Sequence, residues 1–183
     1  LGEVFVATED QEIVDDVTNN GGNAILTSRD HKTGTDRIYE ALKKIDLKGI
    51  DLIMNLQGDE PAINIEDIVS LNKKMINSKS RIGTLAAKIK DFKDLKNENI
   101  VKVITEKNLD NDQFPEAKTF IRNSSNKDNI YHHIGIYCYS SVALEEFVKL
   151  SQSQNEIKNR LEQLRALDND IKINVALAKS SPI

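Results

Sequence analysis

A short apolar segment, residues 51–56, most constrains the fold that this chain can adopt. Its sequence, Asp-Leu-Ile-Met-Asn-Leu, has the length of a strand and lacks polar alternation, which is typical of a strand buried on both faces of a parallel sheet. Two further strands are expected at 4–7 and 24–26, and three amphipathic helices at 10–20, 35–45 and 65–76. This βαβαβα order predicts a doubly wound α/β fold with a mostly parallel sheet.

The second half of the chain changes rhythm, because strands there follow one another through polar loops. Strands are expected at 82–89, 100–105, 118–121, 130–139 and 171–178, loops at 108–115 and 124–129, and helices at 143–150 and 156–167. We therefore expect one domain with three parts: residues 1–81, a smaller β-rich part at 82–140, and helices with a returning strand at 141–183.

Composition excludes several classes of protein. The chain has 183 residues, of which 39% are hydrophobic and 30% charged, and a net charge of −4, which argues against a nucleic-acid partner. Cys138 is the only cysteine, so neither an intrachain disulfide nor a cysteine-cluster zinc site can form, which fits a reducing cytoplasm. No apolar run approaches the roughly 20 residues of a membrane-spanning helix, so we expect no membrane partner.

The segment Leu56-Gln57-Gly58-Asp59-Glu60-Pro61 follows the central predicted strand. Ligands of open α/β sheets bind at this end of the strands. Gly58 allows close approach of a backbone, and Asp59 supplies the hard oxygen that Mg²⁺ prefers beside phosphates. The alternative is an ordinary strand-to-helix turn, in which Asp and Pro are simply favourable residues.

Hydroxyl groups, a glycine and two arginines cluster where the second helix is expected to begin, between Thr27 and Arg37. Helix N-termini attract anions through free N–H groups and the helix dipole. The alternative is an N-cap followed by a solvated loop. The segment matches neither a Walker A loop nor a G-x-G-x-x-G motif.

Alternation along the strand at 130–139 separates two faces. His132, Ile134, Ile136 and Cys138 share one face, and Tyr131, His133, Gly135 and Tyr137 share the other. The first face is mostly apolar, so His132 is expected to be a core histidine. On the second face His133 and Tyr137 flank a residue without a side chain, which predicts a slot for a sugar. A solvent-facing surface with an incidental glycine is the alternative.

The last motif, Arg160-Leu161-Glu162-Gln163-Leu164-Arg165, lies in the predicted helix at 156–167. Helical spacing places Ile157, Leu161 and Leu164 on its buried side. Taken by itself, the pattern favours a surface ion pair between Glu162 and Arg165, which are i, i+3 neighbours.

Together these segments resemble the 3-deoxy-manno-octulosonate (Kdo) cytidylyltransferases, or CMP-Kdo synthetases, of Gram-negative lipopolysaccharide synthesis. Seven motifs stand in the family's order: Val6-Ala7-Thr8-Glu9-Asp10, Gly34-Thr35-Asp36-Arg37, Leu56-Gln57-Gly58-Asp59-Glu60-Pro61, Gly83-Thr84-Leu85-Ala86, Asn99-Ile100-Val101-Lys102-Val103, His133-Ile134-Gly135-Ile136-Tyr137 and Leu161-Glu162-Gln163-Leu164-Arg165.

The resemblance implies a Rossmann-like nucleotidyltransferase fold and the transfer of CMP from CTP to Kdo, releasing pyrophosphate. It implies a homodimer, in which the β-rich part serves dimerisation and sugar binding, and Mg²⁺ as the cofactor. The family's roles carry over by motif: CTP binding by Thr33, Gly34, Thr35, Arg37 and Asp59, metal binding by Asp59, catalysis by Asp59 and Gln57, and sugar binding by Gln57, Arg122, His133, Tyr137, Glu162 and Gln163.

The chain also departs from the family pattern. The family's basic, glycine-containing phosphate loop precedes the first motif, and a second metal-binding Asp follows the last one, so we expect a chain cut short at both ends and inactive by itself. Asn123-Ser124-Ser125 replaces an expected turn with Pro and Trp. The alternatives are a cytidylyltransferase for another acidic sugar, such as sialic acid, and a non-catalytic α/β interaction module.

Overall fold

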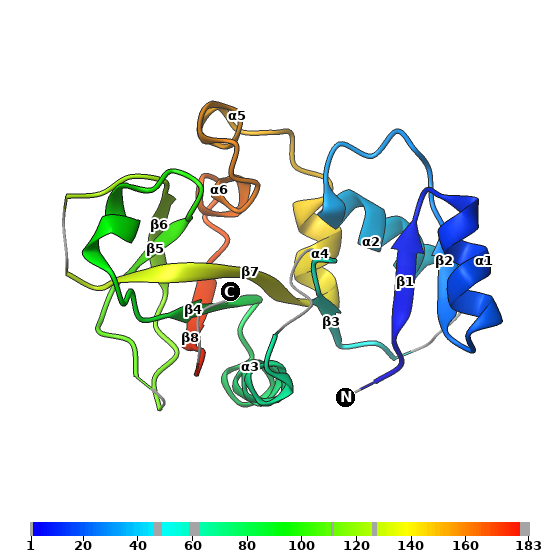
Figure 1. The fold of residues 1–183 in the computed structure, drawn as a ribbon, viewed down its shortest axis with the longest axis horizontal. Coiled ribbons are helices and arrows are strands. Elements are labelled where there is room, and N and C mark those ends of the chain that lie inside the picture. The colour runs from blue at the N-terminus through cyan, green and yellow to red at the C-terminus, as the bar shows by residue number, and fades with distance from the viewer. Residues whose placement is uncertain (1, 46–48, 59–62, 111, 126–127, 180–183) are drawn as a thin grey trace.

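Two sheets organise the chain in a computed structural model, which describes residues 2–45, 49–58, 63–110, 112–125 and 128–179 (Figure 1). The larger sheet has six strands. Five pair in the order β6-β5-β7-β4-β8, and a sixth, β3, also pairs with β7. Their bounds are β3 (Leu52–Asn55), β4 (Ile82–Ala87), β5 (Lys102–Thr105), β6 (Ala117–Ile121), β7 (Ile130–Ser140) and β8 (Ile173–Leu177). The smaller sheet pairs β1 (Phe5–Thr8) in parallel with β2 (Asn23–Leu26).

The α/β class is confirmed, but neighbouring strands of the larger sheet are more often antiparallel than expected. β3, β4, β5 and β8 run in one direction, and β6 and β7 run against them. The reason lies in the connections. Loops without a crossover helix join β5, β6 and β7, and a parallel pair needs a crossover. The sheet also crosses the expected boundaries at residues 81 and 140, so the three-part division stays a prediction.

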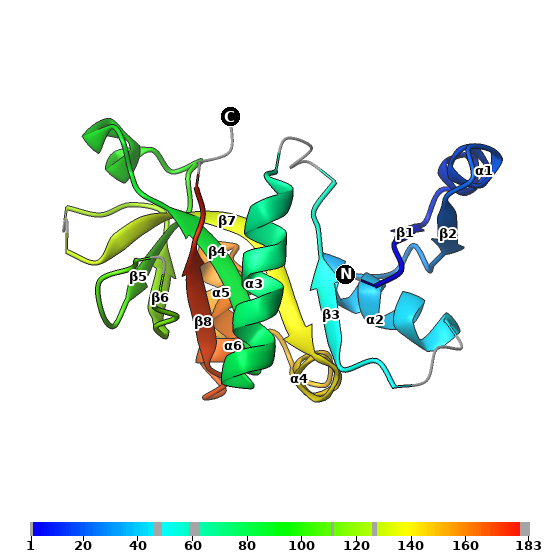
Figure 2. The ribbon, with the colours of Figure 1, turned by 90° about the horizontal axis from the view of Figure 1, so that it is seen from below.

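Helices cover both faces of the larger sheet (Figure 2). On one face lies α3 (Ile65–Ser78), whose Leu71 and Met75 pack with Leu85 and Ile136. On the other face lie α4 (Ser141–Phe147), α5 (Gln154–Asn159) and α6 (Leu164–Leu167), with Phe147 in the core. Strand β4 therefore has all six residues buried.

The expected strand at 51–56 is less buried than its composition suggests. Among the described strands β3 pairs only with β7, its first three residues are half-buried, and Leu56 beyond it is exposed. β4 is the strand buried on both faces. A run of apolar residues predicted the strand correctly, but its burial depends on how many neighbours cover it.

Local sequence explains where the remaining helices begin. α1 (Gln11–Asn19) starts after Asp10, whose carboxylate accepts from the backbone N–H of Glu12. α2 (Gly34–Lys44) starts after Thr33, whose hydroxyl accepts from the backbone N–H of Asp36. Such N-caps satisfy donors that the first helical turn leaves free. A short 3₁₀ helix, η1 (Phe92–Lys96), was not expected. Across the described ranges, none of the helices is both long and apolar enough to traverse a membrane.

Candidate functional site

The turn that begins α2 forms one wall of the candidate site. Thr33 caps the helix and donates its hydroxyl to Asp36 Oδ2 at 2.8 Å. Thr35 is buried, and its hydroxyl lies 3.4 Å from Tyr139 Oη on β7, 104 residues further along the chain. This contact places the positive end of α2 beside β7, where an anion would be favoured.

Glu40 anchors the loop before α2 onto the helix. Its carboxylate accepts the backbone N–H of Ser28 at 3.0 Å, pairs with His31 and binds Lys44 Nζ at 2.7 Å. The Lys44 ammonium, followed by the Ser28 N–H and His31, lowers the pKa of Glu40 to about 2. The carboxylate thus stays ionised at neutral pH, and it fixes the loop that leads to Thr33.

Arg37, one turn into α2, ties three segments together. Its guanidinium donates to Thr27 Oγ1 at 2.7 Å and to Ser28 O at 3.2 Å, and it pairs with Glu9 beyond β1. The structure therefore gives Arg37 a role in holding the Thr27–Thr33 loop. Its contact with a nucleotide stays a prediction.

Gln57, just after β3, lies between the α2 turn and β7. A methyl group built on Gly34 would be 3.8 Å from Gln57 Nε2, and one on Gly135 would be 3.7 Å from Gln57 Cγ. The two glycines therefore lie against the same side chain. The structure brings together Gly34, Gln57 and Gly135, three positions that the sequence assigned to different motifs.

The β7 face that carries His133, Gly135 and Tyr137 looks toward this site, and His133 is buried within it. Its Nε2 lies 3.0 Å from Thr84 Oγ1, and its ring meets Phe120 edge-on at 5.0 Å and Tyr137 at 5.5 Å. Burial lowers the pKa of His133 to about 3, with a smaller effect from His132. The imidazole is therefore neutral at physiological pH.

Two buried oxygen atoms lack a hydrogen-bond partner in the described part of the chain: Tyr137 Oη and Glu162 Oε1. Leaving a buried polar group unpaired costs about 1–3 kcal/mol, so each such atom needs an explanation. Burial, together with the nearby Tyr139 and Glu162, raises the pKa of Tyr137 well above its ordinary value. The phenol thus stays protonated and keeps a proton to donate.

Glu162 closes the site from the turn between α5 and α6. Burial raises the pKa of its carboxyl, against the lowering effect of the Thr35 and Thr33 hydroxyls and of Arg165. Glu162 therefore faces the start of α2, and Gln163 follows it on the same turn. Together the α2 turn, Gln57, the β7 face and Glu162 enclose polar groups suited to a hydroxyl-rich, anionic ligand.

Known proteins resemble the chain over nearly its whole length. A sequence profile of the cytidylyltransferases matches residues 1–173. The 3-deoxy-manno-octulosonate cytidylyltransferase of Thermodesulfovibrio yellowstonii is 44% identical over 98% of this chain and 74% of its own length. That of Bartonella henselae is 42% identical over the whole chain and 76% of its own. The chain belongs to the cytidylyltransferase family.

Solved structures give the same result. A structure described as CMP:2-keto-3-deoxy-manno-octonic acid synthetase complexed with CTP superposes with a TM-score of 0.85 at 31% identity, covering 100% of this chain and 76% of the other. A 4-diphosphocytidyl-2C-methyl-D-erythritol synthase from Anaerococcus prevotii has a TM-score of 0.59 at 18% identity over 99% of this chain and 74% of its own. At that identity the second match supports the fold alone.

In this cytidylyltransferase the last motif differs from the helical prediction. The expected helix at 156–167 is wrong as one element, because Arg160 adopts a left-handed conformation with φ of 53° and separates α5 from α6. Leu161 and Leu164 are buried as expected, but Ile157 is 61% exposed. The expected surface pair of Glu162 and Arg165 is also wrong, since Arg165 binds Glu156 and both are buried.

The expectation for His132 is wrong as well. His132 is half-buried and His133 is the buried member of the pair. The face assignment itself is confirmed, since Ile134, Ile136 and Cys138 pack in one cluster and Tyr131 and Tyr137 in the other. Across the sheet His132 pairs with Ala87 of β4 on one side and with Lys102 of β5 on the other.

Sequence reasoning also missed two residues of the site. Thr84 holds His133, and Tyr139 contacts Thr35. A single hydroxyl within the apolar strand Ile82–Ala87 was the available signal for Thr84. For Tyr139 the signal was its position two residues after Tyr137, on the same face.

The metal-binding prediction rests on one carboxylate. Asp59, its one predicted ligand, lies outside the described residues. Within the described ranges no group of three or more His, Cys, Asp or Glu side chains is arranged to hold a metal ion. The assignment of Mg²⁺ to Asp59 thus stays a prediction from the motif.

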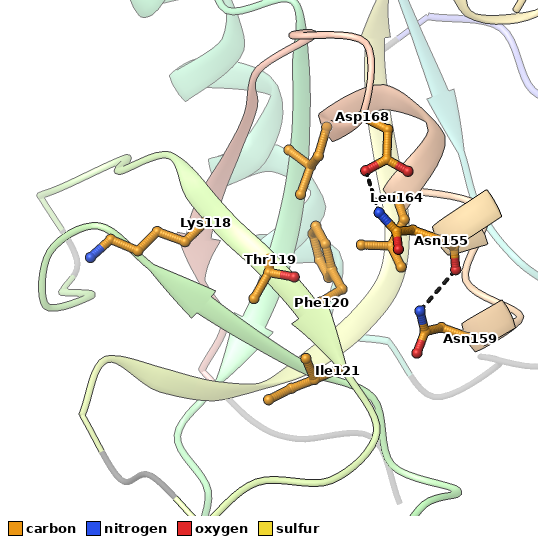
Figure 3. A pocket seen from close by; sticks show the side chains of 9 residues that line it. Lys118, Thr119, Phe120, Ile121, Asn155, Asn159, Leu164 and Asp168 are labelled. Atoms are coloured by element: carbon orange, nitrogen blue, oxygen red, sulfur yellow. Dashed lines mark hydrogen bonds between the residues drawn. The ribbon is translucent and has the colours of Figure 1, made fainter. Parts of the chain in front are cut away.

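A cavity of about 310 Å³ lies apart from the predicted site residues (Figure 3). It lies between β6 and the α5–α6 segment, where Asn155 Nδ2 donates to Asp168 Oδ1 at 2.9 Å and Asn159 Nδ2 donates to Asn155 O at 2.9 Å. None of the predicted site residues lines it. Hydrogen bonds between its lining residues instead brace the turn.

Proposed function

We propose that this cytidylyltransferase transfers CMP from CTP to Kdo, which yields CMP-Kdo and pyrophosphate. The observation that carries the proposal is the convergence of the α2 turn, Gln57, the β7 face and Glu162 around two unpaired buried oxygen atoms. It is supported by relatives named as Kdo cytidylyltransferases at 42–44% identity. The whole reaction is attack of the sugar's anomeric hydroxyl on the α-phosphorus of CTP, with pyrophosphate leaving.

The groups of the site divide between the two substrates. The N-terminus of α2, with Thr33, Gly34 and Thr35, offers backbone N–H groups to phosphate oxygens. Tyr137 donates its hydroxyl proton to a sugar oxygen, and Glu162 accepts from a sugar hydroxyl. Gln57 lies at the junction, with a donor and an acceptor for either substrate. Catalysis then rests on positioning and on neutralisation of phosphate charge.

His133 acts in this scheme as a neutral wall of the sugar pocket. Its Nε2 is engaged by Thr84, and its lowered pKa keeps a positive charge out of the pocket. It therefore orients Tyr137, whose ring it contacts, and does not serve as a cationic partner for the sugar's carboxylate.

Three parts of the proposal rest on the family pattern. Mg²⁺ would be held by Asp59 and would neutralise the phosphates of CTP. A homodimer would form through the β-rich part of the chain. The cytoplasm is the proposed location, because the only thiol, Cys138, is buried and free and needs no oxidising compartment.

The test measures pyrophosphate release by the full-length protein with CTP and Mg²⁺. Kdo and N-acetylneuraminate are supplied in parallel at equal concentration. Turnover with Kdo at a rate well above that with the sialic acid supports the proposal. Preference for the sialic acid would replace Kdo by the alternative acidic sugar, and no turnover with either would favour a non-catalytic module.

A further inference from the structure

The turn that carries Glu162 and Gln163 has a backbone that needs external support. Arg160, which begins it, adopts a left-handed conformation with φ of 53°. Such a conformation costs a residue with a side chain about 1 kcal/mol or more, and it persists only where the surroundings enforce it. Two arginines, Arg165 and Arg122, hold this turn through hydrogen bonds.

A buried ion pair joins the two helices that flank the turn. Arg165 donates from Nε to Glu156 Oε2 at 2.9 Å and from Nη2 to Glu156 Oε1 at 2.5 Å. The guanidinium also lies over the Phe147 ring, 4.7 Å from its centroid. Backbone hydrogen bonds from Leu161 N to Glu156 O and from Arg165 N to Glu162 O also tie the turn to the two helices.

Arg122 binds the backbone of the turn. The residue directly follows β6, and its Nε donates to Asn159 O at 3.0 Å and its Nη2 to Arg160 O at 3.1 Å. A third donor, Nη1, reaches Glu98 O at 2.9 Å. The guanidinium thus joins the left-handed residue to the loop before β5.

Arg122 is itself held in place. The fully buried ammonium of Lys102 donates to Arg122 O at 2.6 Å, and also to Asn97 O and Ile100 O. The side chains of Lys102 and Arg122 therefore donate their hydrogen bonds to backbone carbonyls. This is a different arrangement from a free guanidinium directed at a ligand's carboxylate.

We propose that Arg122 is a positioning residue, which acts with the Glu156–Arg165 pair to hold Glu162 and Gln163 at the sugar pocket. The proposal rests on the proposed function and deepens it, because it changes how the affinity for the sugar arises. Arg122 contributes through the carbonyls of residues 159 and 160, and the sugar's affinity depends on it indirectly.

The geometry of the three bonds makes the arginine hard to replace. A guanidinium reaches three carbonyls in fixed directions within one plane, whereas an ammonium is a point charge on a flexible stem. Arg122→Lys keeps the positive charge but loses the planar arrangement of N–H donors. A lysine would retain much of a direct attraction to a carboxylate, but it would not restore the grip on the turn.

The first test compares Arg122→Lys and Arg122→Gln with Arg81→Gln, a control in which a partly exposed arginine paired with Glu146 is lost. Both Arg122 variants should raise KM for Kdo about tenfold, the change expected when a charged hydrogen bond is lost. KM for CTP should stay within about twofold in all three. Rescue by Arg122→Lys to the wild-type KM would overturn the proposal.

The second test is a double-mutant cycle with Glu162→Gln. If Arg122 acts through the turn, Arg122→Gln should add little to the rise in KM for Kdo that Glu162→Gln already causes. Independent contact with the sugar predicts full additivity, which would overturn the proposal.

The third test needs no substrate, so it separates this proposal from the proposed function. Amide hydrogen exchange at residues 160–164 should be faster in Arg122→Gln than in the wild type or in Arg81→Gln. If the wild type releases no pyrophosphate with Kdo, the proposed function fails while exchange still decides the role of Arg122. Unchanged exchange in Arg122→Gln would overturn the positioning role whatever the sugar.

Discussion

At the scale of single residues, burial decides the chemistry of the candidate site. His133 is kept neutral, Tyr137 keeps its proton, and the carboxyl of Glu162 has a raised pKa, each with desolvation as the first cause. Side chains exposed on an isolated strand would retain their ordinary titration behaviour. Burial therefore keeps His133 and Tyr137 uncharged at neutral pH, and it favours the protonated form of Glu162.

The neutral state of His133 predicts a dependence of stability on pH. Its pKa is about 3 in the folded protein and about 6.5 in the unfolded chain. Between these values the unfolded chain binds more protons, so stability is complete above pH 6.5 and is lost as the pH falls. From pH 7 to pH 5 this one histidine should lower the free energy of unfolding by about 2 kcal/mol.

Urea unfolding of the wild type and of His133→Asn at pH 7 and pH 5 measures this effect. The variant should be less stable at pH 7, because Thr84 loses its ring partner, but it should lose less stability on acidification. His132→Asn is the matched control, since His132 is only half-buried and burial lowers its pKa against the opposing effect of Asp94. Equal pH dependence in the wild type and His133→Asn would contradict the prediction.

At the scale of helices and strands, periodicity predicted most elements but not the break at Arg160. Apolar residues at 157, 161 and 164 keep helical spacing, and arginine is a good helix former. The left-handed conformation of Arg160 is stabilised by Arg122, 38 residues away in sequence. The spacing of apolar residues within a helix cannot predict a contact over that separation. The antiparallel position of β7 was missed for a related reason, since loop lengths, not strand composition, fix it.

The candidate site shows the same division. Strand alternation placed His133 and Tyr137 on one face, and the structure agrees, since their ring centroids lie 5.5 Å apart. It could not predict that His133 is buried, because Thr84 and Phe120 come from other strands. Residue types along one strand predict the face to which each side chain points. How deeply a side chain is buried depends on the elements that pack against that strand.

The packing of α3 on β4 gives a prediction at this scale. A methyl group on Gly83 would lie 2.6 Å from Met75 Sδ and 3.0 Å from both Leu71 Cδ1 and Phe114 Cζ. Gly83→Ala therefore overpacks the interface, and it should lower the free energy of unfolding by about 1–3 kcal/mol. Gly135→Ala is the control, because its methyl group would be at ordinary contact distance, 3.7 Å from Gln57 Cγ.

Chemical denaturation of both variants measures how much stability each added methyl group costs. The expected order of stability is wild type, then Gly135→Ala close to it, then Gly83→Ala clearly below. A Gly83→Ala protein as stable as the wild type would mean that α3 shifts on β4 at little cost. The close packing around Gly83 would then not require a glycine.

At the scale of the whole molecule, the candidate site joins segments that are distant in sequence. The α2 turn near residue 34, Gln57 after β3, residues 133–137 of β7 and Glu162 after α5 all meet there. The binding site that they form exists only while the first third and the last third of the chain are folded together. Binding should therefore stabilise the molecule against global unfolding, and not one segment alone.

This coupling can be measured without turnover. Kdo at a hundred times its dissociation constant should raise the free energy of unfolding by about 2.7 kcal/mol, and CTP should do the same at its own hundredfold excess. Glu162→Gln, if it weakens Kdo binding tenfold, should cut the increase with Kdo at the same concentration to about 1.4 kcal/mol. It should retain the increase with CTP, because Glu162 is assigned to the sugar and the α2 turn to the nucleotide. Arg81→Gln should retain both. Loss of both effects in Glu162→Gln would mean that Glu162 also supports the α2 turn through Thr33 and Thr35, and that the division of the site between two substrates is wrong.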